Sequence, residues 1–337
     1  MPQPFDAVLL VSFGGPGGRH EIRPFLRNVL RARQIPERRL EAVVRHYEQF
    51  DGVSPLTEIT MRQAAGLRER LAADGPALPT YVGMRNWHPF LEDTLAEMAR
   101  AGVRRALALT LAAHHSYSSC GQYKQNASTA LQALRQAGHP DIELTYVARW
   151  HDHPGFVRAN VRHIEQAIGA LPRARRTAAR IVFTAHSIPS DMARQSRYEA
   201  DLLESARLIA AAAGRTDWAL VYQSRSGRPQ DPWLGPDVCD YLRAQSERGL
   251  EAVVLSPLGF VADHVEVLYD LDHEAAETCR EVGIEMRRAA AVNDDPAFLD
   301  MLADVVRATA RRYGAGRPLS IAPAAPPARS EPPPPAR

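Results

Sequence analysis

The run EAVVLSPLG, residues 251–259, is short and almost continuously apolar until it reaches a proline and a glycine. Similar runs recur at residues 6–13, 80–84, 105–112, 142–148, 179–185, 218–224 and 284–290. Strands that are buried on both faces of a parallel sheet have this character. Segments with helical periodicity, such as residues 153–171, lie between the runs. The alternation predicts an α/β protein built on parallel sheets.

The apolar runs fall into two successive groups of four, which predict two similar doubly wound halves, each with a four-stranded parallel sheet. A chain of 337 residues is also long enough for about two domains. We expect an N-terminal domain over residues 1–172 and a C-terminal domain over residues 173–315. The last amphipathic helix, about 296–313, should pack back on the first domain. The proline-rich residues 316–337 should form a disordered tail.

Composition excludes several classes of protein. A net charge of +2 gives no basic surface that would favour nucleic acid as a partner. Cys120, Cys239 and Cys279 are odd in number and form no C-x-x-C pair, which is typical of a reducing compartment. The longest apolar run, residues 106–113, is far short of the roughly 18 residues that a transmembrane helix needs. With no signal-peptide pattern at the N-terminus, we expect a soluble, cytoplasmic protein.

The expected sheets also locate the chemistry, because ligands of open parallel sheets bind beyond the carboxyl ends of the strands. The segments at that edge are SFGGPGG (12–18), AAHHSYSSC (112–120), TAHSIP (184–189), QSRSGRPQDPWLGP (223–236) and SPLGFVADHVE (256–266). SFGGPGG matches neither G-x-G-x-x-G nor a P-loop, so it indicates a tight turn close to Phe13 rather than a nucleotide site. His114 and His115 are weaker candidate metal ligands, because adjacent residues seldom serve one site.

The strongest candidates for chemistry are His186, just past the fifth strand, and Glu266, beyond the seventh. If these strands are neighbours, the two side chains approach each other, and an imidazole opposite a carboxylate suits proton transfer or a divalent metal such as Fe²⁺. A spacing of four residues aligns Glu266, Asp270 and Glu274 along one helix face. These like charges repel, and a hydrated divalent cation would offset the repulsion. An ordinary polar helix face is the alternative, and it suffices for Glu277.

Aromatic and basic residues near the same edge indicate the kind of ligand. Several aromatic side chains around one cleft suit a large, flat, apolar molecule, and arginines nearby would pair with carboxylates on it. The aromatic candidates are Trp87, Phe90, Tyr117, Tyr123 and Trp233, and the basic ones are Arg31, Arg33 and Arg225.

Taken together, these segments resemble the ferrochelatases, which insert Fe²⁺ into a porphyrin during heme biosynthesis. The matching stretches are LLVSFGGP (9–16), HYEQFDGVSPLTEIT (46–60), GMRNWHPF (83–90), FTAHSIP (183–189), DPWLGPDV (231–238) and SPLGFVADHVEVLYDLDHE (256–274). The resemblance covers about residues 5–313. It implies two Rossmann-like domains with the porphyrin bound in an active-site cleft between them.

The resemblance also implies roles for single residues. His186 and Glu266 match the catalytic and metal-binding pair that faces the macrocycle centre, and Asp270 and Glu274 match relay acids on a helix with a widened turn. Porphyrin contacts are implied for Phe13, Arg31 or Arg33, Tyr47, Ser54 and Tyr123. Our hypothesis is that His186 accepts pyrrole protons while Glu266 orients it or relays the metal. Which of the two touches the metal first stays open.

Two departures from the family pattern affect the expected cofactors. Phe13 stands where some bacterial relatives carry a tyrosine that binds the product iron, so that contact is not expected. Some relatives hold a [2Fe–2S] cluster on cysteines near the C-terminus, whereas no cysteine follows Cys279 here. We therefore expect no cluster, Fe²⁺ as a substrate only, and a monomeric enzyme.

Coproporphyrin III is the favoured substrate. The SYSSCGQYKQN segment (116–126), GMRNWHPF and the lack of an apolar membrane-docking lip resemble soluble enzymes that act on this porphyrin. It has four propionates where the alternative, protoporphyrin IX, has two. A cobalt or nickel chelatase for sirohydrochlorin-type rings would not be expected to share HSIP with DPWLGP. A non-enzymatic tetrapyrrole-binding protein would have no need of the acid row.

Overall fold

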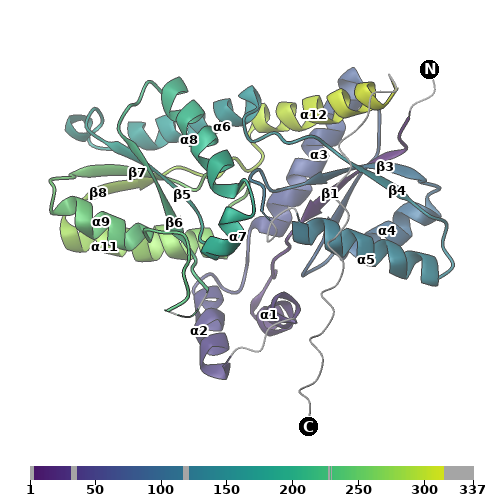
Figure 1. Ribbon diagram of the computed structural model, residues 1–337, viewed down its shortest axis with the longest axis horizontal. Coiled ribbons are helices and arrows are strands. Elements are labelled where there is room, and N and C mark those ends of the chain that lie inside the picture. The colour runs from purple at the N-terminus through teal and green to yellow at the C-terminus, as the bar shows by residue number, and fades with distance from the viewer. Residues whose placement is uncertain (1–3, 32–35, 117–120, 227, 229, 315–337) are drawn as a thin grey trace, which may run out of the picture.

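The computed structural model describes residues 4–31, 36–116, 121–226, 228 and 230–314. Arg33, Tyr117, Cys120 and the expected tail at 316–337 lie outside this part of the chain. Two four-stranded parallel sheets, each flanked by helices, make up the fold (Figure 1). This arrangement confirms the predicted α/β class.

Every run that the sequence predicted to be a strand contains one. The first sheet has the order β2-β1-β3-β4, with β1 at Ala7–Ser12, β2 at Thr80–Met84, β3 at Arg105–Thr110 and β4 at Glu143–Tyr146. The second repeats it as β6-β5-β7-β8, with β5 at Arg180–His186, β6 at Trp218–Gln223, β7 at Ala252–Ser256 and β8 at Glu285–Arg288. Buried residues fill β1 and β7 from end to end, as expected for strands with helices on both faces.

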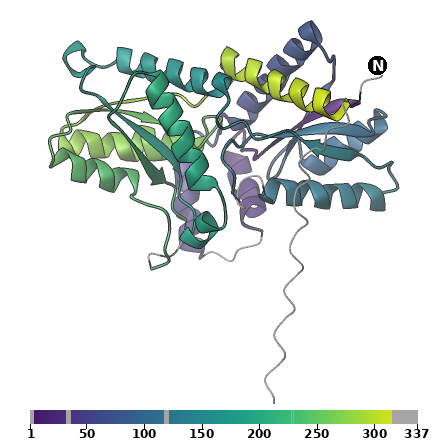
Figure 2. The ribbon, with the colours of Figure 1, turned by 45° about the horizontal axis from the view of Figure 1, so that its top comes forward.

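Among its described residues, the first half has three α-helices between β1 and β2 and one α-helix in each of its next two strand connections. They are α1 (Ile22–Leu30), α2 (Glu37–Glu48), α3 (Leu56–Asp74), α4 (Leu91–Arg100) and α5 (Gln122–Gln136), preceded by the 3₁₀ turn η1 (Arg19–Glu21). Both α1 and α2 project from the layered sheets (Figures 1 and 2). Their apolar faces enclose Phe25 and Tyr47 together with Val265 of the second half. The two halves therefore share a small core beside the acid row.

The second half contains α6 (Pro154–Gly169), α7 (Ser190–Arg194), α8 (Tyr198–Ala212), α9 (Val238–Ser246), α10 (Val265–Val267), α11 (Ala276–Val282) and α12 (Pro296–Gly314), with the 3₁₀ turn η3 at Arg173–Arg175. A π-helix, η4 (Leu268–Ala275), joins α10 to α11. The predicted amphipathic segments at 153–171 and 296–313 correspond to α6 and α12 within two residues at each end.

Helix α12 lies along α3 and α6, where glycines make close approach possible (Figure 2). A Cβ atom at Gly66 of α3 would stand 2.5 Å from Leu299 Cδ1, and one at Gly155 of α6 would stand 2.6 Å from Met301 Cβ. The Arg70–Asp300 ion pair, at 2.5 Å, lies at the edge of the α3 contact. The exact domain boundary remains a prediction. Helix α6 falls within the range 1–172 that was predicted for the N-terminal domain, but it contacts α8, β7 and β8 of the second half. We therefore infer that α6 packs with the second sheet.

Among the described residues, no helix combines the length and the apolar character needed to cross a lipid bilayer.

Candidate active site

The site forms where the order of the second sheet reverses, between the neighbouring strands β5 and β7. His186 is the last residue of β5, and the segment leading to Glu266 follows β7. The Gly259 N–H donates to Thr184 O at 2.9 Å, and a Cβ atom there would stand 2.6 Å from Ala185 Cβ. Glycine is thus required for the segment after β7 to cross directly over β5. Open parallel sheets bind their ligands at such a switch point.

His186 and Glu266 meet as the sequence predicted, with 3.9 Å between His186 Nε2 and Glu266 Oε2. Both side chains are partly exposed, at 34% and 44%. The other ring nitrogen, His186 Nδ1, lies 2.5 Å from Ser187 O. Because a carbonyl oxygen only accepts, this contact assigns the proton to Nδ1. In the neutral ring, Nε2 therefore presents its lone pair toward Glu266 and the surrounding space.

The turn that holds His186 joins two of the motifs found in the sequence. Ser187 N–H donates to Gln223 O at 2.8 Å, and Leu234 N–H donates to Ile188 O at 3.0 Å. The Ser187 hydroxyl donates to Leu234 O at 2.7 Å. These hydrogen bonds hold the HSIP segment (186–189) and the DPWLGP segment (231–236) together. The Tyr198 hydroxyl of α8 also donates to His186 O, at 3.0 Å.

Glu266 is close to two histidines, because the Oε2 atom that faces His186 Nε2 also lies 3.8 Å from His264 Nε2. Burial alone would raise the pKa of Glu266, but His264 and the positive charge of His186 outweigh it and lower the pKa to about 2. Glu266 therefore stays ionised to a lower pH than an ordinary glutamate, whose pKa is 4.5. Glu266 is an anion at neutral pH and stabilises any positive charge that develops on either imidazole.

The predicted row of acids begins with Glu266 in α10 and continues with Asp270 and Glu274 in the π-helix, whose wider turn changes how successive side chains align. Asp270 accepts hydrogen bonds from Gln223 Nε2, at 3.1 Å, and from the Ser224 hydroxyl. Burial raises its pKa to about 7, and the charges of Glu266 and Glu274 act in the same direction, against the two hydrogen bonds. Asp270 therefore changes protonation state near neutral pH.

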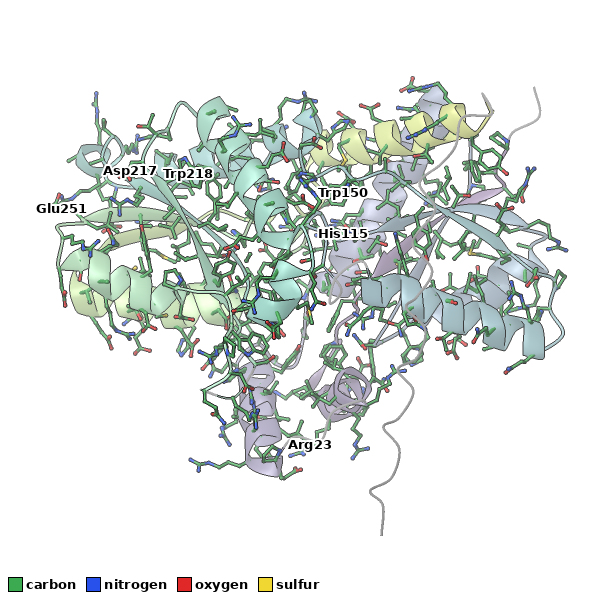
Figure 3. The ribbon with its side chains drawn as sticks, in the orientation of Figure 1. Arg23, His115, Trp150, Asp217, Trp218 and Glu251 are labelled. Carbon is green, nitrogen blue, oxygen red and sulfur yellow. The ribbon has the colours of Figure 1, made fainter. Side chains whose placement is uncertain are left out.

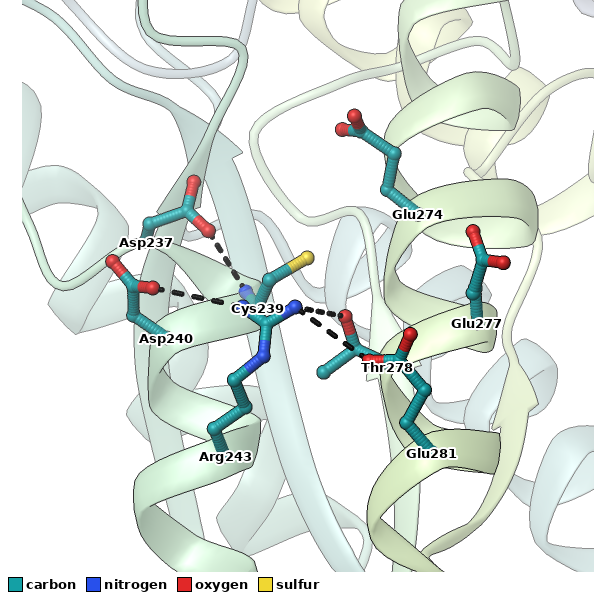
Figure 4. Close-up of a pocket in the computed structure, with 8 residues that line it drawn as sticks. All are labelled: Asp237, Cys239, Asp240, Arg243, Glu274, Glu277, Thr278 and Glu281. Atoms are coloured by element: carbon teal, nitrogen blue, oxygen red, sulfur yellow. Dashed lines mark hydrogen bonds and ion pairs between the residues drawn. The ribbon is translucent and has the colours of Figure 1, made fainter.

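Glu274 lies at the outer end of the row, on the wall of a cavity of about 320 Å³ between α9 and α11 (Figure 4). Burial raises the pKa of Glu274, and the charge of Asp237 across the cavity adds to the effect. Burial also raises the pKa of the Cys239 thiol to about 11, so this cysteine is a thiol at neutral pH. The cavity is acidic apart from Arg243, which lies 3.8 Å from Asp240 and 3.9 Å from Glu281.

Two of the expected porphyrin contacts, Phe13 and Tyr123, flank one guanidinium group in the first half. The Arg85 guanidinium lies 5.7 Å from the centre of the Phe13 ring and 4.8 Å from that of Tyr123. Asn126 accepts a 2.7 Å hydrogen bond from Arg85 and fixes its position. Arg31 is exposed, with its side chain turned to the backbone oxygens of Asn28 and Arg85.

Tyr47 is the member of the expected set that the structure brings toward Glu266. It is 7% exposed, and its pKa is raised by burial and further by the charge of Glu266. Ser54 is also buried. It packs so closely on Gly15 that a Cβ atom at Gly15 would stand 2.6 Å from Ser54 Cβ.

In the SFGGPGG segment Gly14 has a φ of +86°, and two backbone N–H groups donate to side chains of the protein. Gly15 N–H donates to Thr57 Oγ1 at 3.2 Å, and Gly17 N–H donates to Glu21 Oε2 at 2.7 Å. The same Glu21 oxygen accepts from Trp87 Nε1 at 2.8 Å. Glu21 therefore connects the glycine-rich segment with Trp87.

Sequence reasoning missed residues that orient the others. Asp263, which binds Arg288 at 2.9 Å and Asn293 Nδ2 at 2.8 Å, fixes the segment before Glu266. His264, Gln223 and Ser224 were likewise not predicted. The D-H-x-E pattern was a signal for His264, whereas nothing in the sequence connects residues 223 and 224 with Asp270.

Comparison with known proteins identifies the family of this chain. A family model described as Ferrochelatase matches residues 5–310. This chain belongs to the ferrochelatase family. A relative from Rhodopirellula baltica named Ferrochelatase is 46% identical over 308 residues, covering 90% of this chain and 86% of the relative. One from Mycolicibacterium smegmatis named Coproporphyrin III ferrochelatase is 46% identical over 307 residues, covering 90% of this chain and 89% of the relative.

Solved structures show the fold alone. SirB from Bacillus subtilis with Fe³⁺ superposes with a TM-score of 0.58 at 11% identity, covering 93% of this ferrochelatase and 99% of SirB. A second SirB structure, in complex with cobalt, gives a TM-score of 0.54 at 12% identity, with coverages of 92% and 97%. The two-sheet architecture is thus the one that chelatases share.

Proposed function

We propose that this member of the ferrochelatase family inserts Fe²⁺ into coproporphyrin III and that His186 and Glu266 carry out the exchange. The family assignment supports the reaction, and the approach of His186 Nε2 to Glu266 is the observation that carries the assignment of residues. Insertion replaces two pyrrole protons by one metal ion. The site must therefore accept protons on one side of a ring and receive a cation.

In this proposal His186 is the proton acceptor. Its Nε2 lone pair is available because Nδ1 is bonded to Ser187 O. Glu266, which the two histidines keep ionised, stabilises the imidazolium that forms. The same carboxylate has the charge to attract an incoming Fe²⁺ ion, so proton removal and metal approach involve one pair of side chains.

Asp270 and Glu274 would then connect the pair with solvent. A carboxyl group with a pKa of about 7 takes up and releases protons with equal ease at neutral pH, which suits Asp270 to a relay. Glu274 opens onto the acidic cavity between α9 and α11, where the excess of carboxylates favours cations. The row of acids would therefore favour both the release of protons from the site to solvent and the arrival of the metal ion at the site.

The choice of coproporphyrin III rests on the names of the similar proteins, several of which are coproporphyrin III ferrochelatases of 43–46% identity. Four propionates need several hydrogen-bond donors or cations around the ring. Arg31, Ser54 and Tyr123, with Arg33 outside the described residues, are the groups that we propose for this purpose. Protoporphyrin IX, with two propionates, is the alternative substrate.

Anaerobic insertion of Fe²⁺, followed by loss of porphyrin fluorescence, tests the proposal. The wild type should metallate coproporphyrin III faster than protoporphyrin IX at equal concentration. His186→Ala and Glu266→Gln should abolish turnover but still bind porphyrin, and Glu69→Gln, which removes an exposed acid on α3 away from the cavity, serves as the matched control. Full insertion by His186→Ala would refute the assigned role. Porphyrin binding without insertion by the wild type would indicate a tetrapyrrole-binding protein instead.

A further inference from the structure

A second group of potential metal ligands lies away from the proposed active site. His151 stands in the segment just before α6, and Asp201 and Glu204 are one turn apart on α8. His151 Nε2 is 3.1 Å from Glu204 Oε2 and 3.7 Å from Asp201 Oδ1. One donor atom from each of the three lies within 4.8 Å of the other two. Figure 3 labels Trp150, the residue before His151, between the two halves of the molecule.

Two of the three residues in this cluster, His151 and Asp201, are buried. Asp201 is fully buried, and its Oδ2 atom has no hydrogen-bond partner among the described residues. His151 is 6% exposed, and its Nδ1 atom is likewise unsatisfied in that part of the chain. A buried carboxylate oxygen without a donor is costly, because nothing replaces the water that it has lost. A cation held by Asp201 would supply what is missing.

The neighbouring side chains do not supply it. Arg197 Nε reaches Asp201 Oδ1, at 3.1 Å, and the arginine side chain is 58% exposed. The Ser205 hydroxyl faces the backbone oxygens of His151, at 2.8 Å, and of Asp201, at 3.0 Å. These contacts fix the backbone and Asp201 Oδ1, the oxygen nearest His151, and they leave Oδ2 without a donor among the described residues.

We propose that His151, Asp201 and Glu204 form a binding site for a divalent transition-metal ion. One imidazole nitrogen with two carboxylate oxygens is a ligand set that suits Zn²⁺, Mn²⁺ or Fe²⁺ better than Mg²⁺ or Ca²⁺. Glu204 is 41% exposed, which leaves an entry side and room for water as a further ligand. The ion would join α8 to the segment before α6.

Such an ion would act on the proposed active site only through α8. Tyr198 is the first residue of that helix, and its hydroxyl donates to the backbone oxygen of His186. Asp201 lies in the first turn of the same helix. Fixing α8 therefore fixes the turn that carries His186. We assign the ion a positioning role and no part in proton or metal transfer to the ring.

Metal binding by the full chain tests the site. The variant His186→Ala/Glu266→Gln removes the proposed active-site ligands, and after dialysis against EDTA it is titrated with Zn²⁺ by calorimetry. We expect one tight Zn²⁺ equivalent and a rise in Tm on binding. Adding Asp201→Asn or the half-exposed Glu204→Gln should weaken Zn²⁺ binding at least about tenfold and remove the rise in Tm. Adding Asp191→Asn, an exposed acid on α7, should change neither.

The visible spectrum of bound Co²⁺ reports directly on the metal ligands, so replacing a residue with a purely structural role would not change it. Co²⁺ bound to the double variant should show visible ligand-field bands, and these should shift or vanish with Glu204→Gln even if that protein folds normally. No tight Zn²⁺ equivalent in the double variant would overturn the proposal. So would Zn²⁺ binding that survives both Asp201→Asn and Glu204→Gln, since the ion would then lie elsewhere. Neither result would bear on the insertion activity.

Discussion

Replacing Asp270 with asparagine should stabilise the protein at alkaline pH. Burial raises the pKa of Asp270 from 3.8 to about 7, and the charges of Glu266 and Glu274 contribute in the same direction. In the unfolded chain the carboxyl group titrates near its ordinary value. Between these two pH values the folded protein therefore holds a proton that the unfolded chain has released. The free energy of unfolding falls as the pH rises through this window.

The size of the effect follows from the two pKa values. A pKa difference of about 3 corresponds to ~4 kcal/mol of lost stability above pH 7. Asp270 is partly accessible to water, so screening reduces this figure, and we expect about 2–4 kcal/mol. Asparagine cannot ionise, and its amide oxygen still accepts from Ser224. Asp270→Asn should thus match the wild type near pH 4 and exceed its stability by that amount at pH 8.

Urea denaturation of both proteins at several pH values, with EDTA present, measures the difference. Glu277→Gln is the control, because it removes an exposed carboxylate from the same stretch and should leave the pH dependence unchanged. A stability gain in Asp270→Asn that is equal at pH 5 and pH 8 would show that the carboxyl group is not held protonated by burial. Fe²⁺ insertion should fall in the same variant if Asp270 relays protons.

Other substitutions test the supports of the site. Gly259→Ala, whose Cβ would stand 2.6 Å from Ala185 Cβ, should lower the free energy of unfolding by about 1–3 kcal/mol and reduce insertion, as urea denaturation and the fluorescence assay would show. His46→Ala removes a ring stacked on Tyr269 at 3.7 Å, and thermal denaturation should show a loss of about 0.5–1.5 kcal/mol. Phe298→Ala opens a cavity in the fully buried core of α12 and should cost about 3–5 kcal/mol in chemical denaturation.

The fold was predictable because its central strands are buried on both faces, although the edge strands β4 and β8 are only partly buried. Continuous apolar runs such as those of β1 and β7 have no amphipathic alternative, and each run contained a strand. The pairing of β5 with β7 was also predictable, since two similar halves repeat one strand order. The approach of His186 to Glu266 followed from that pairing.

What the sequence did not predict depends on contacts between segments that are distant along the chain. Gln223 and Ser224 reach Asp270 across 46 or 47 positions, and polar residues of this kind are common at strand ends. His151 and Asp201 meet because α6 packs on α8, which no local pattern encodes. Arg33 lies outside the described residues, so its expected contact with a porphyrin stays a prediction.

The position of α12 has a consequence for how the protein is made. Helix α12 is the last described element to leave the ribosome, yet it packs on α3, whose residues were synthesised some 230 positions earlier, as in the Arg70–Asp300 pair. Domains fold as units, N-terminal ones first, during synthesis. The apolar face of α3 around Gly66 and Leu67 therefore stays uncovered until α12 has been synthesised. A chain truncated before α12 would leave that face exposed to solvent, and we expect such a chain to aggregate rather than to form a shortened enzyme.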